Sequence, residues 1–339
     1  MSFKIRVEPS GHEFTAQDEE TILDAALRQG ITLPYSCRNG SCGSCKGAVR
    51  AGNVEYGVYE DKALSAEERR TGQALFCQAV PRSDLVIVAR EIAGAQDIAI
   101  RTLPARVVKM ERVAPDVMVL SLKLPQNERL QYLAGQYIDI LLKDGQRRSF
   151  SLAGAPHADE HLQLHIRHVP GGLFTGHVFT GMQEKELLRF RGPLGVFFLR
   201  ADADRPIVFV AGGTGFAPVK GILEHAFAKG EARPLHLYWG VRARRDLYMH
   251  ELAQSWAAAH GNFRYTPVLS DPLPEDRWGG RTGFVHEVVA ADYPDLSGHE
   301  VYASGPPPMI EALKRVANER GLPADRLYFD SFEFAHATK

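Results

Sequence analysis

The four cysteines of the 339-residue chain are the residues whose spacing most directly suggests chemistry. Cys37, Cys42 and Cys45 follow a C-x4-C-x2-C spacing in a loop of glycine and serine, and Cys77 is the last cysteine of the chain. This spacing is typical of a two-iron, two-sulfur cluster, whereas structural zinc sites usually pair two short knuckles. Small residues let the backbone wrap around a bulky anionic cluster. The sequence therefore predicts a 2Fe-2S cluster on these thiols, with zinc or buried thiols as the alternatives.

A second group of polar residues ends a predicted strand and has the sequence Arg148-Ser149-Phe150-Ser151. The next predicted strand contains Leu164-His165-Ile166-Arg167, in which apolar and polar residues alternate. This alternation places His165 on a strand and argues against a metal site built from the neighbouring histidines. The segment Gly171-Gly172-Leu173-Phe174-Thr175 follows and offers backbone N–H groups and a hydroxyl that suit a pyrophosphate.

A glycine turn after a third apolar strand is the third feature. Residues 207–211 lead into Gly212-Gly213-Thr214-Gly215-Phe216-Ala217-Pro218, and a strand, a glycine turn and a helix in that order can bind phosphate. The turn lacks the Gly-Lys-Ser/Thr of a Walker A loop, and Pro218 suits the first turn of the helix. We expect this turn to bind a dinucleotide.

These groups together resemble known protein families. Residues 3–90 are similar to a plant-type ferredoxin of β-grasp fold, and residues 102–200 resemble the flavin domain of the ferredoxin-NADP reductase superfamily. The run Val301-Tyr302-Ala303-Ser304-Gly305-Pro306-Pro307-Pro308-Met309 resembles the nicotinamide-binding end of that superfamily. Many relatives have tyrosine in place of Phe150, and relatives often have cysteine in place of Ser304.

The resemblance implies a role for individual residues. Arg148 would pair with the flavin phosphates, Phe150 would cover the isoalloxazine or ribityl region, and Ser151 would approach the flavin N5. The expected catalytic residues are Ser151, Ser304 and Asp330. The expected FAD-binding residues are Arg148, Ser149, Phe150, Ser151, His165, Ile166, Arg167, Gly172, Leu173, Thr175 and Phe332. The expected nicotinamide-binding residues are Gly213, Thr214, Gly215, Arg242, Gly305, Pro306 and Met309.

The choice between NADH and NADPH depends on the segment after the predicted strand 235–239. Arg242, Arg244 and Arg245 lie there, and no acidic residue directly follows the strand to bind a ribose 2′-hydroxyl. By the general rule for this fold, arginines favour a 2′-phosphate. The overall resemblance favours NADH, so we expect NADH as the donor and keep NADPH as the alternative.

Length and composition agree with a multidomain globular protein. A chain of 339 residues predicts two to three domains, and its composition is 45% hydrophobic and 24% charged. The net charge of -1 argues against nucleic acid as the main partner. The N-terminus lacks a signal-peptide pattern, and no apolar run approaches the roughly 18 residues that cross a bilayer. We therefore expect a cytoplasmic protein without a membrane partner.

The expected fold class is a multidomain α/β plus β protein. Residues 1–92 are expected to form a β-grasp ferredoxin domain, and the small and polar residues 93–101 a linker. Short β-like runs in residues 102–200 predict an antiparallel β-barrel that binds FAD. Strands and helices alternate in residues 201–339, which predicts a Rossmann-like parallel sheet that binds NAD(P)H.

The order of these parts suggests a path for electrons. It resembles the reductase components of aromatic-ring dioxygenases and multicomponent monooxygenases, and the CDP-6-deoxy-glucoseen reductases. A nicotinamide releases two electrons as hydride and the cluster accepts one, so a flavin between them is required. We expect an oxidoreductase that passes electrons from NADH through FAD to the cluster, and singly to a partner protein, an oxygenase or dehydrase component. We expect a monomer. The alternatives are a flavin reductase that releases reduced flavin and an iron-sulfur redox-sensor module.

Overall fold

The computed structural model describes residues 2–95, 98–158, 160–201 and 203–333 of the chain. The chain divides into two units, one of residues 1–99 with 333–339 and the other of residues 100–332. Gln96 and Asp97 of the expected linker lie outside the described residues. Of the helices that the model describes, none is both long and apolar enough to cross a membrane.

The first unit is built on a mixed sheet with the strand order β2-β1-β7-β3-β5. The strands are β1 (Phe3–Glu8), β2 (Glu13–Ala16), β3 (Lys46–Ala51), β5 (Gln73–Leu75) and β7 (Leu85–Val88), with β4 (Val54–Glu55) and β6 (Val80–Pro81) paired separately. Helix α1 (Ile22–Arg28) begins after Thr21, whose hydroxyl accepts the Asp24 N–H, and α2 spans Ala66–Arg70. The parallel pairing of β1 with β7 and the helix after the first hairpin form the expected β-grasp fold.

A six-stranded antiparallel sheet begins the second unit, in the order β11-β10-β13-β8-β9-β12. Its strands are β8 (Arg101–Ala114), β9 (Val117–Lys123), β10 (Tyr137–Leu141), β11 (Arg147–Ser151), β12 (Leu162–Arg167) and β13 (Leu187–Leu194). The two edge strands meet through an antiparallel bridge between Leu152 and Leu164, so the sheet closes into a barrel. Helix α3 (Leu173–Thr180) buries Phe174 and Val178 in the barrel core.

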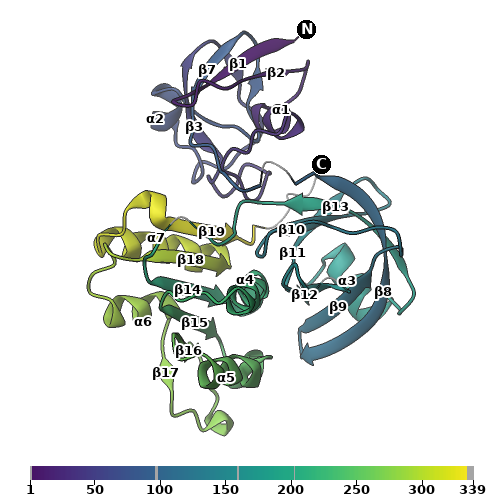
Figure 1. Cartoon of the computed structure of the whole chain (residues 1–339), viewed down its shortest axis with the longest axis vertical. Helices are drawn as coiled ribbons and strands as arrows, with labels where there is room; N and C mark the ends of the chain where they lie inside the picture. The colour runs from purple at the N-terminus through teal and green to yellow at the C-terminus, as the bar shows by residue number, and fades with distance from the viewer. Residues whose placement is uncertain (1, 96–97, 159, 202, 334–339) are drawn as a thin grey trace. The chain divides into compact units, whose positions relative to one another are not determined.

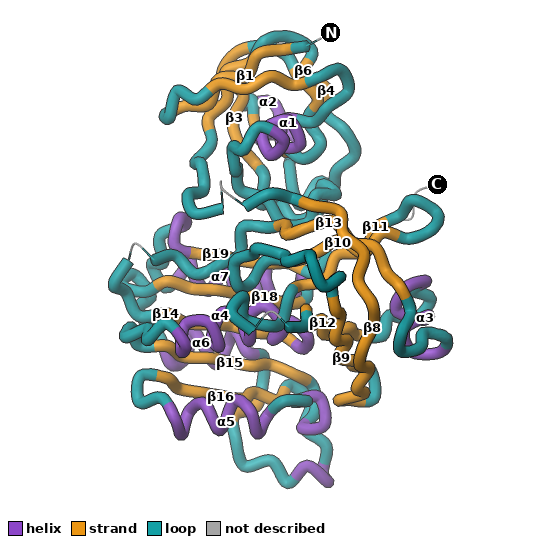
Figure 2. Tube along the Cα trace, turned by 45° about the vertical axis from the view of Figure 1, so that its right-hand side comes forward, coloured by secondary structure: helices purple, strands orange, loops and turns teal. Residues whose placement is uncertain are grey.

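A parallel sheet forms the rest of the second unit, and Figure 2 shows its strands lying side by side. The strand order is β17-β16-β15-β14-β18-β19, with all neighbours parallel. The strands are β14 (Ile207–Gly212), β15 (Leu235–Val241), β16 (Phe263–Leu269), β17 (Arg281–Thr282), β18 (Glu300–Gly305) and β19 (Leu327–Ser331). Helices α4 (Phe216–Ala228) and α5 (His250–Ala259) contribute to the core on one face, and α6 (Val285–Asp292) and α7 (Pro307–Glu319) to that on the other.

The direction of the strand order reverses between β14 and β18. Ligands of open α/β sheets bind at such a reversal, beyond the carboxyl ends of the strands. In this chain the reversal lies at the glycine turn after β14 and at Gly305, where β18 ends. Figure 1 shows α4, which begins after this turn, between the parallel sheet and the barrel strands.

Candidate functional site

The three clustered cysteines lie in the loop between α1 and β3, and Cys77 lies two residues after the end of β5. Two glycines of this loop have a left-handed backbone, with φ of +81° at Gly40 and +75° at Gly43. A Cβ atom at Gly40 would lie only 2.5 Å from the Val58 carbonyl oxygen, so the loop needs glycine there. The Arg38 side chain, 5% exposed, pairs with Asp24 of α1 at 2.7 Å and adds positive charge inside the loop.

The four thiols are arranged in two pairs. Cys37 donates a hydrogen bond to Cys42, and Cys45 donates one to Cys77. The hydrogen bond from Cys37, with further donors from Ser44, lowers the pKa of Cys42 to about 6. Donating that hydrogen bond, and burial, raise the pKa of the Cys37 thiol well above its usual range. The low pKa of Cys42 favours a thiolate, which is the form that binds metals.

This two-by-two arrangement fits a binuclear cluster. Each pair of thiols would hold one iron, and the Ser44 N–H donates to the Cys42 sulfur over 3.4 Å, as donors around cluster sulfurs do. In the described part of the chain, no three Cys, His, Asp or Glu side chains are grouped to hold one metal ion. The pairing is the arrangement expected if each of two irons is held by two thiols.

The motif of residues 148–151 occupies the end of β11, with side chains on alternate faces. The Arg148 guanidinium donates to the Arg147 carbonyl and to Gln146, and the Phe150 ring lies 5.3 Å from that of Phe174. The Ser149 hydroxyl instead donates to the buried Asp139 at 2.6 Å, so it faces β10. Ser151 is buried, and its hydroxyl donates to the carboxylate of Asp330, on β19 of the parallel sheet, at 3.3 Å.

The expected pyrophosphate segment forms the start of helix α3. Gly172 is the N-cap, and no side chain caps the first N–H groups, so these groups can donate hydrogen bonds to an anion. The Thr175 hydroxyl bonds within the segment, to the N–H and carbonyl of Val169. A Cβ atom at Gly172 would lie 2.5 Å from the Thr175 hydroxyl oxygen, so the helix start fits only glycine. The Leu173 side chain is 64% exposed.

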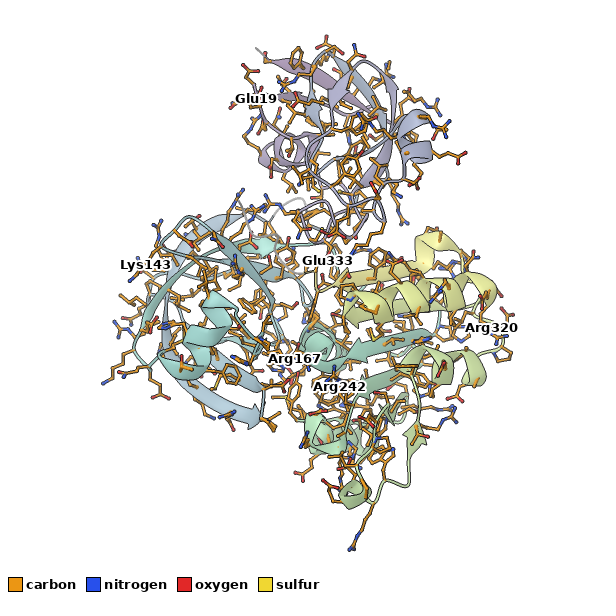
Figure 3. All side chains as sticks on the ribbon, turned by 180° about the vertical axis from the view of Figure 1, so that it is seen from behind. Glu19, Lys143, Arg167, Arg242, Arg320 and Glu333 are labelled. Carbon is orange, nitrogen blue, oxygen red and sulfur yellow. The ribbon has the colours of Figure 1, made fainter. Side chains whose placement is uncertain are left out.

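The three expected site residues of β12 have different surroundings. Ile166 is fully buried in the barrel core, so only its backbone could contact a cofactor. The Arg167 guanidinium pairs with Asp116 at 2.8 Å, and its Nη1 atom would lie 3.7 Å from a Cβ atom placed at Gly213. Figure 3 shows Arg167 and Arg242 on the barrel side and the sheet side of the boundary between the two domains. His165 is buried, and its Nδ1 atom lies 2.9 Å from the Tyr248 hydroxyl.

Burial, with a smaller effect from the charge of Lys220, lowers the pKa of His165 from 6.5 to about 3. Between these two values the unfolded chain binds a proton that the folded chain does not, so folding is destabilised as pH falls below 6.5. One such proton changes the unfolding free energy by about 1.4 kcal/mol per pH unit. We expect His165→Gln to flatten the loss of stability between pH 6.5 and pH 4.

Denaturant unfolding followed by tryptophan fluorescence measures this effect, because all three tryptophans, Trp239, Trp256 and Trp278, lie in the second unit. His161→Gln in the same barrel is the matched control and should keep the wild-type pH dependence. A variant at His165 whose stability falls as steeply as that of the wild type would contradict the prediction.

The glycine turn after β14 meets the end of β18 backbone to backbone. A Cβ atom at Gly215 would lie 2.0 Å from the Ser304 carbonyl oxygen, and one at Gly212 would lie 2.6 Å from the Met309 sulfur. Gly305 has φ of +147°, and a Cβ atom there would lie 2.9 Å from the Gly212 carbonyl oxygen. This close approach explains why the turn needs glycine, and a glycine turn between a strand and a helix is the kind of segment that binds the phosphates of a dinucleotide.

Ser304 lies in register between Ala211 of β14 and Asp330 of β19. The residue is fully buried, and its hydroxyl oxygen has no hydrogen-bond partner among the residues that the model describes. An unsatisfied buried hydroxyl costs about 1–3 kcal/mol. The carboxamide of a nicotinamide bound at this end of the sheet would supply a partner, so the site fits that group. The Phe332 N–H donates to the Gly305 carbonyl over 2.9 Å, which holds the chain after β19 at the same place.

Three aromatic or basic residues near these motifs were not predicted to be site residues from the sequence. The Trp239 indole N–H donates to the Gly213 carbonyl over 3.0 Å and so fixes the glycine turn. Tyr248 contacts His165, and the buried Lys220 of α4 donates to the Ala153 carbonyl over 3.2 Å. A lysine in the first turns of a helix gives no signal of burial in the sequence, so only the structure shows its role.

Comparison with known protein families assigns one model to each of the three parts. The 2Fe-2S iron-sulfur cluster binding domain matches residues 5–82, the oxidoreductase FAD-binding domain residues 104–199 and the oxidoreductase NAD-binding domain residues 209–315. The CDP-6-deoxy-L-threo-D-glycero-4-hexulose-3-dehydrase reductase of Yersinia pseudotuberculosis is 41% identical over 98% of this chain and 99% of its own. Reductase component 1 of the terephthalate 1,2-dioxygenase of Comamonas sp. is 34% identical, with 98% of each chain covered.

Solved structures similar to this chain are also reductases. A crystal structure of a cytochrome P450 reductase from Amycolatopsis has a TM-score of 0.82 and 36% identity, covering 97% of this chain and 98% of that chain. The ferredoxin reductase in carbazole 1,9a-dioxygenase has a TM-score of 0.73 and 27% identity over 98% of this chain and 99% of its own.

The chain belongs to the family of iron-sulfur flavoprotein reductases, which join a 2Fe-2S domain to FAD-binding and NAD-binding oxidoreductase domains. The expected fold class and the expected cofactors, a 2Fe-2S cluster, FAD and a nicotinamide nucleotide, are confirmed. The chain is an electron-transfer oxidoreductase, as the order of its motifs predicts.

Proposed function

We propose that this reductase takes hydride from NADH and delivers single electrons to the dehydrase that acts on a CDP-6-deoxy-hexulose. The dehydrase is preferred over an oxygenase as the partner because the Yersinia dehydrase reductase is 41% identical to this chain, against 34% for the terephthalate dioxygenase reductase. When bound, FAD supplies the conversion between a two-electron donor and a one-electron acceptor. The cluster, held by the two thiol pairs, supplies the one-electron exit.

The observation that carries the proposal is the hydrogen bond between Ser151 and Asp330. It joins the end of the flavin strand to a strand of the nicotinamide domain, beside Ser304, whose hydroxyl has no hydrogen-bond partner within the described part of the chain. A serine, a carboxylate and a second serine thus lie where the two cofactors would have to meet. Arg148 and the free N–H groups at the start of α3 would hold the flavin phosphates.

The preference for NADH is supported by a cavity of about 730 Å³ beyond the end of β15. Arg244 and Arg245 line it, but so do the carboxylates of Glu251, Glu275 and Asp276. Asp276 also accepts the Arg244 backbone N–H at 3.1 Å. Three carboxylates beside two arginines make the cavity a poor site for the 2′-phosphate of NADPH, because like charges repel.

The test starts from the purified holoprotein. We expect gel filtration to give a monomer that retains FAD, iron and acid-labile sulfide. Under anaerobic conditions, NADH should reduce the flavin of this protein faster than the same concentration of NADPH does. Reduced protein should then transfer electrons to a CDP-6-deoxy-hexulose dehydrase. Loss of FAD on the column with reduction of added free FAD would instead show a flavin reductase. A protein that binds the cluster but reduces none of the electron acceptors offered to it would be a redox sensor.

A further inference from the structure

The first turns of α4 contain a buried charged residue that the proposed function does not use. Residues 216–223 of this helix are all buried, and Lys220 among them has a side chain only 9% exposed. A buried ammonium is costly unless it is paired and hydrogen-bonded. Lys220 donates to Glu224, one turn further along the helix, at 2.9 Å. It also donates at 3.2 Å to the carbonyl of Ala153, which belongs to the barrel.

Ala153 lies two residues beyond Ser151, in the segment that follows the flavin strand β11. This segment is itself tied to β12, because the Ala153 N–H donates to the Gln163 carbonyl. Gly221, next to the lysine, approaches the same segment so closely that a Cβ atom would lie 2.8 Å from the Gly154 carbonyl oxygen. The lysine bond and the glycine contact together fix the position of α4 along the flavin segment.

A second contact joins the flavin barrel to the parallel-sheet domain that contains α4. The Tyr248 hydroxyl lies 2.9 Å from Nδ1 of His165 on β12. The Tyr248 ring packs edge-on against Trp239, with the ring centroids 5.2 Å apart. Trp239 in turn stacks on Phe216 at 4.0 Å and donates to the Gly213 carbonyl. A continuous set of contacts therefore runs from the flavin barrel to the glycine turn that opens α4.

We propose that Lys220 is a positioning residue for hydride transfer, acting through the Ala153 carbonyl, and that Tyr248 supports it through His165. Together they hold the glycine turn and the end of the flavin strand in one relative position. The inference rests on the proposed function, because it assumes that hydride passes between these two domains. Hydride transfer requires reacting atoms within roughly 3–3.5 Å, and a displacement of about 1 Å can cost about a hundredfold in rate.

The test is Lys220→Met, which keeps an unbranched side chain only one heavy atom shorter and removes the three N–H donors of the ammonium group. In the holoprotein we expect flavin reduction by saturating NADH, followed by anaerobic stopped flow, to slow by at least about tenfold. FAD content and the apparent Kd for NADH should stay close to wild type, and the primary isotope effect with deuterated NADH should increase. Reduction of the flavin by dithionite needs no hydride alignment and should be unchanged.

Three further variants distinguish a positioning role of Lys220 from effects of its charge or of altered folding. Lys220→Arg keeps a donor for the carbonyl and should recover part of the lost rate. The double variant K220M/E224Q removes the carboxylate left without its lysine, and the slow hydride transfer should persist in it. Lys229→Met, exposed at the end of the same helix, is the matched control and should behave as wild type.

A Lys220→Met protein that retains FAD and is reduced by NADH at the wild-type rate would overturn the inference. If the Lys220→Met variant loses FAD or fails to fold, the same measurements on Tyr248→Phe test the inference instead, because that substitution removes only one hydroxyl. Slower reduction by NADH with unchanged dithionite reduction would then support the inference, and wild-type reduction would overturn it. Failure of the proposed function looks different, because it appears in the wild-type protein itself, as loss of FAD on the column, as no reduction by NADH or as no transfer of electrons to the dehydrase.

Discussion

Replacing Cys42 by serine is expected to abolish NADH-dependent reduction of cytochrome c while reduction of ferricyanide continues at close to the wild-type rate. Cys42 forms a pair with Cys37, and its lowered pKa makes it a thiolate near neutral pH. A serine hydroxyl stays protonated there and does not replace a thiolate as a ligand. The FAD-binding and NAD-binding domains match residues 104–199 and 209–315, within the second unit, so we expect ferricyanide to take electrons without the cluster.

Visible absorption, iron content and the two acceptor assays on one preparation measure this result. Ser44→Ala is the matched control, because it removes a hydroxyl 3.3 Å from the Cys42 sulfur and leaves all four thiols in place. We expect this control to keep the cluster and both activities. Equal loss of both activities in Cys42→Ser would show that the cluster chiefly stabilises the fold, which would contradict its assignment as the electron exit.

Substituting Gly215 by alanine is expected to remove most NADH-dependent activity while FAD remains bound. The added methyl group would lie 2.0 Å from the Ser304 carbonyl oxygen and 2.8 Å from the Gly305 nitrogen, both of which are backbone atoms that cannot rotate away. The turn and the end of β18 must therefore separate. A displacement of about 1 Å at a reacting site can cost roughly a hundredfold in rate, and overpacking costs about 1–3 kcal/mol in stability.

Ferricyanide reduction at varied NADH gives kcat/KM, and tryptophan fluorescence during unfolding gives the stability of the second unit. Gly261→Ala in the same sheet domain is the matched control, since nothing lies within 4 Å of its added Cβ atom. It should leave kcat/KM and FAD content unchanged. Wild-type kcat/KM in Gly215→Ala would mean that the turn does not position the nicotinamide nucleotide.

Much of the fold could be predicted because apolar periodicity is strong where strands and helices are buried. The predicted strands at 162–167 and 207–211 agree with β12 and β14 to within one residue. Helix α3 was not predicted. Its sequence Leu-Phe-Thr-Gly-His-Val-Phe-Thr has a central glycine and no amphipathic period, and the helix depends on packing of Phe174 and Val178 in the barrel core.

The site was predictable where a motif is local and less so where it depends on long-range pairing. The cysteine spacing and the glycine turn each fall within a few consecutive residues. The bond between Ser151 and Asp330 joins residues 179 positions apart, and no local pattern specifies it. Ser149 shows the same limit, because its hydroxyl bonds to Asp139 on the neighbouring strand, ten positions earlier. Sequence pattern identifies the groups, but sheet register decides which of them meet.

The pairing of the thiols would give the two irons of a bound cluster different effects on the stability of the first unit. Cys37 and Cys42 are close in the sequence, so an iron between them cross-links only a short segment. Cys45 and Cys77 lie on opposite sides of a segment that contains β3, α2 and β5, so the second iron closes a long loop. In the chain-entropy model, a cross-link of that length disfavours the unfolded chain by roughly 3–4 kcal/mol. If these thiols bind a cluster as predicted, loss of the link between Cys45 and Cys77 would therefore cost the first unit more stability than loss of the link between Cys37 and Cys42.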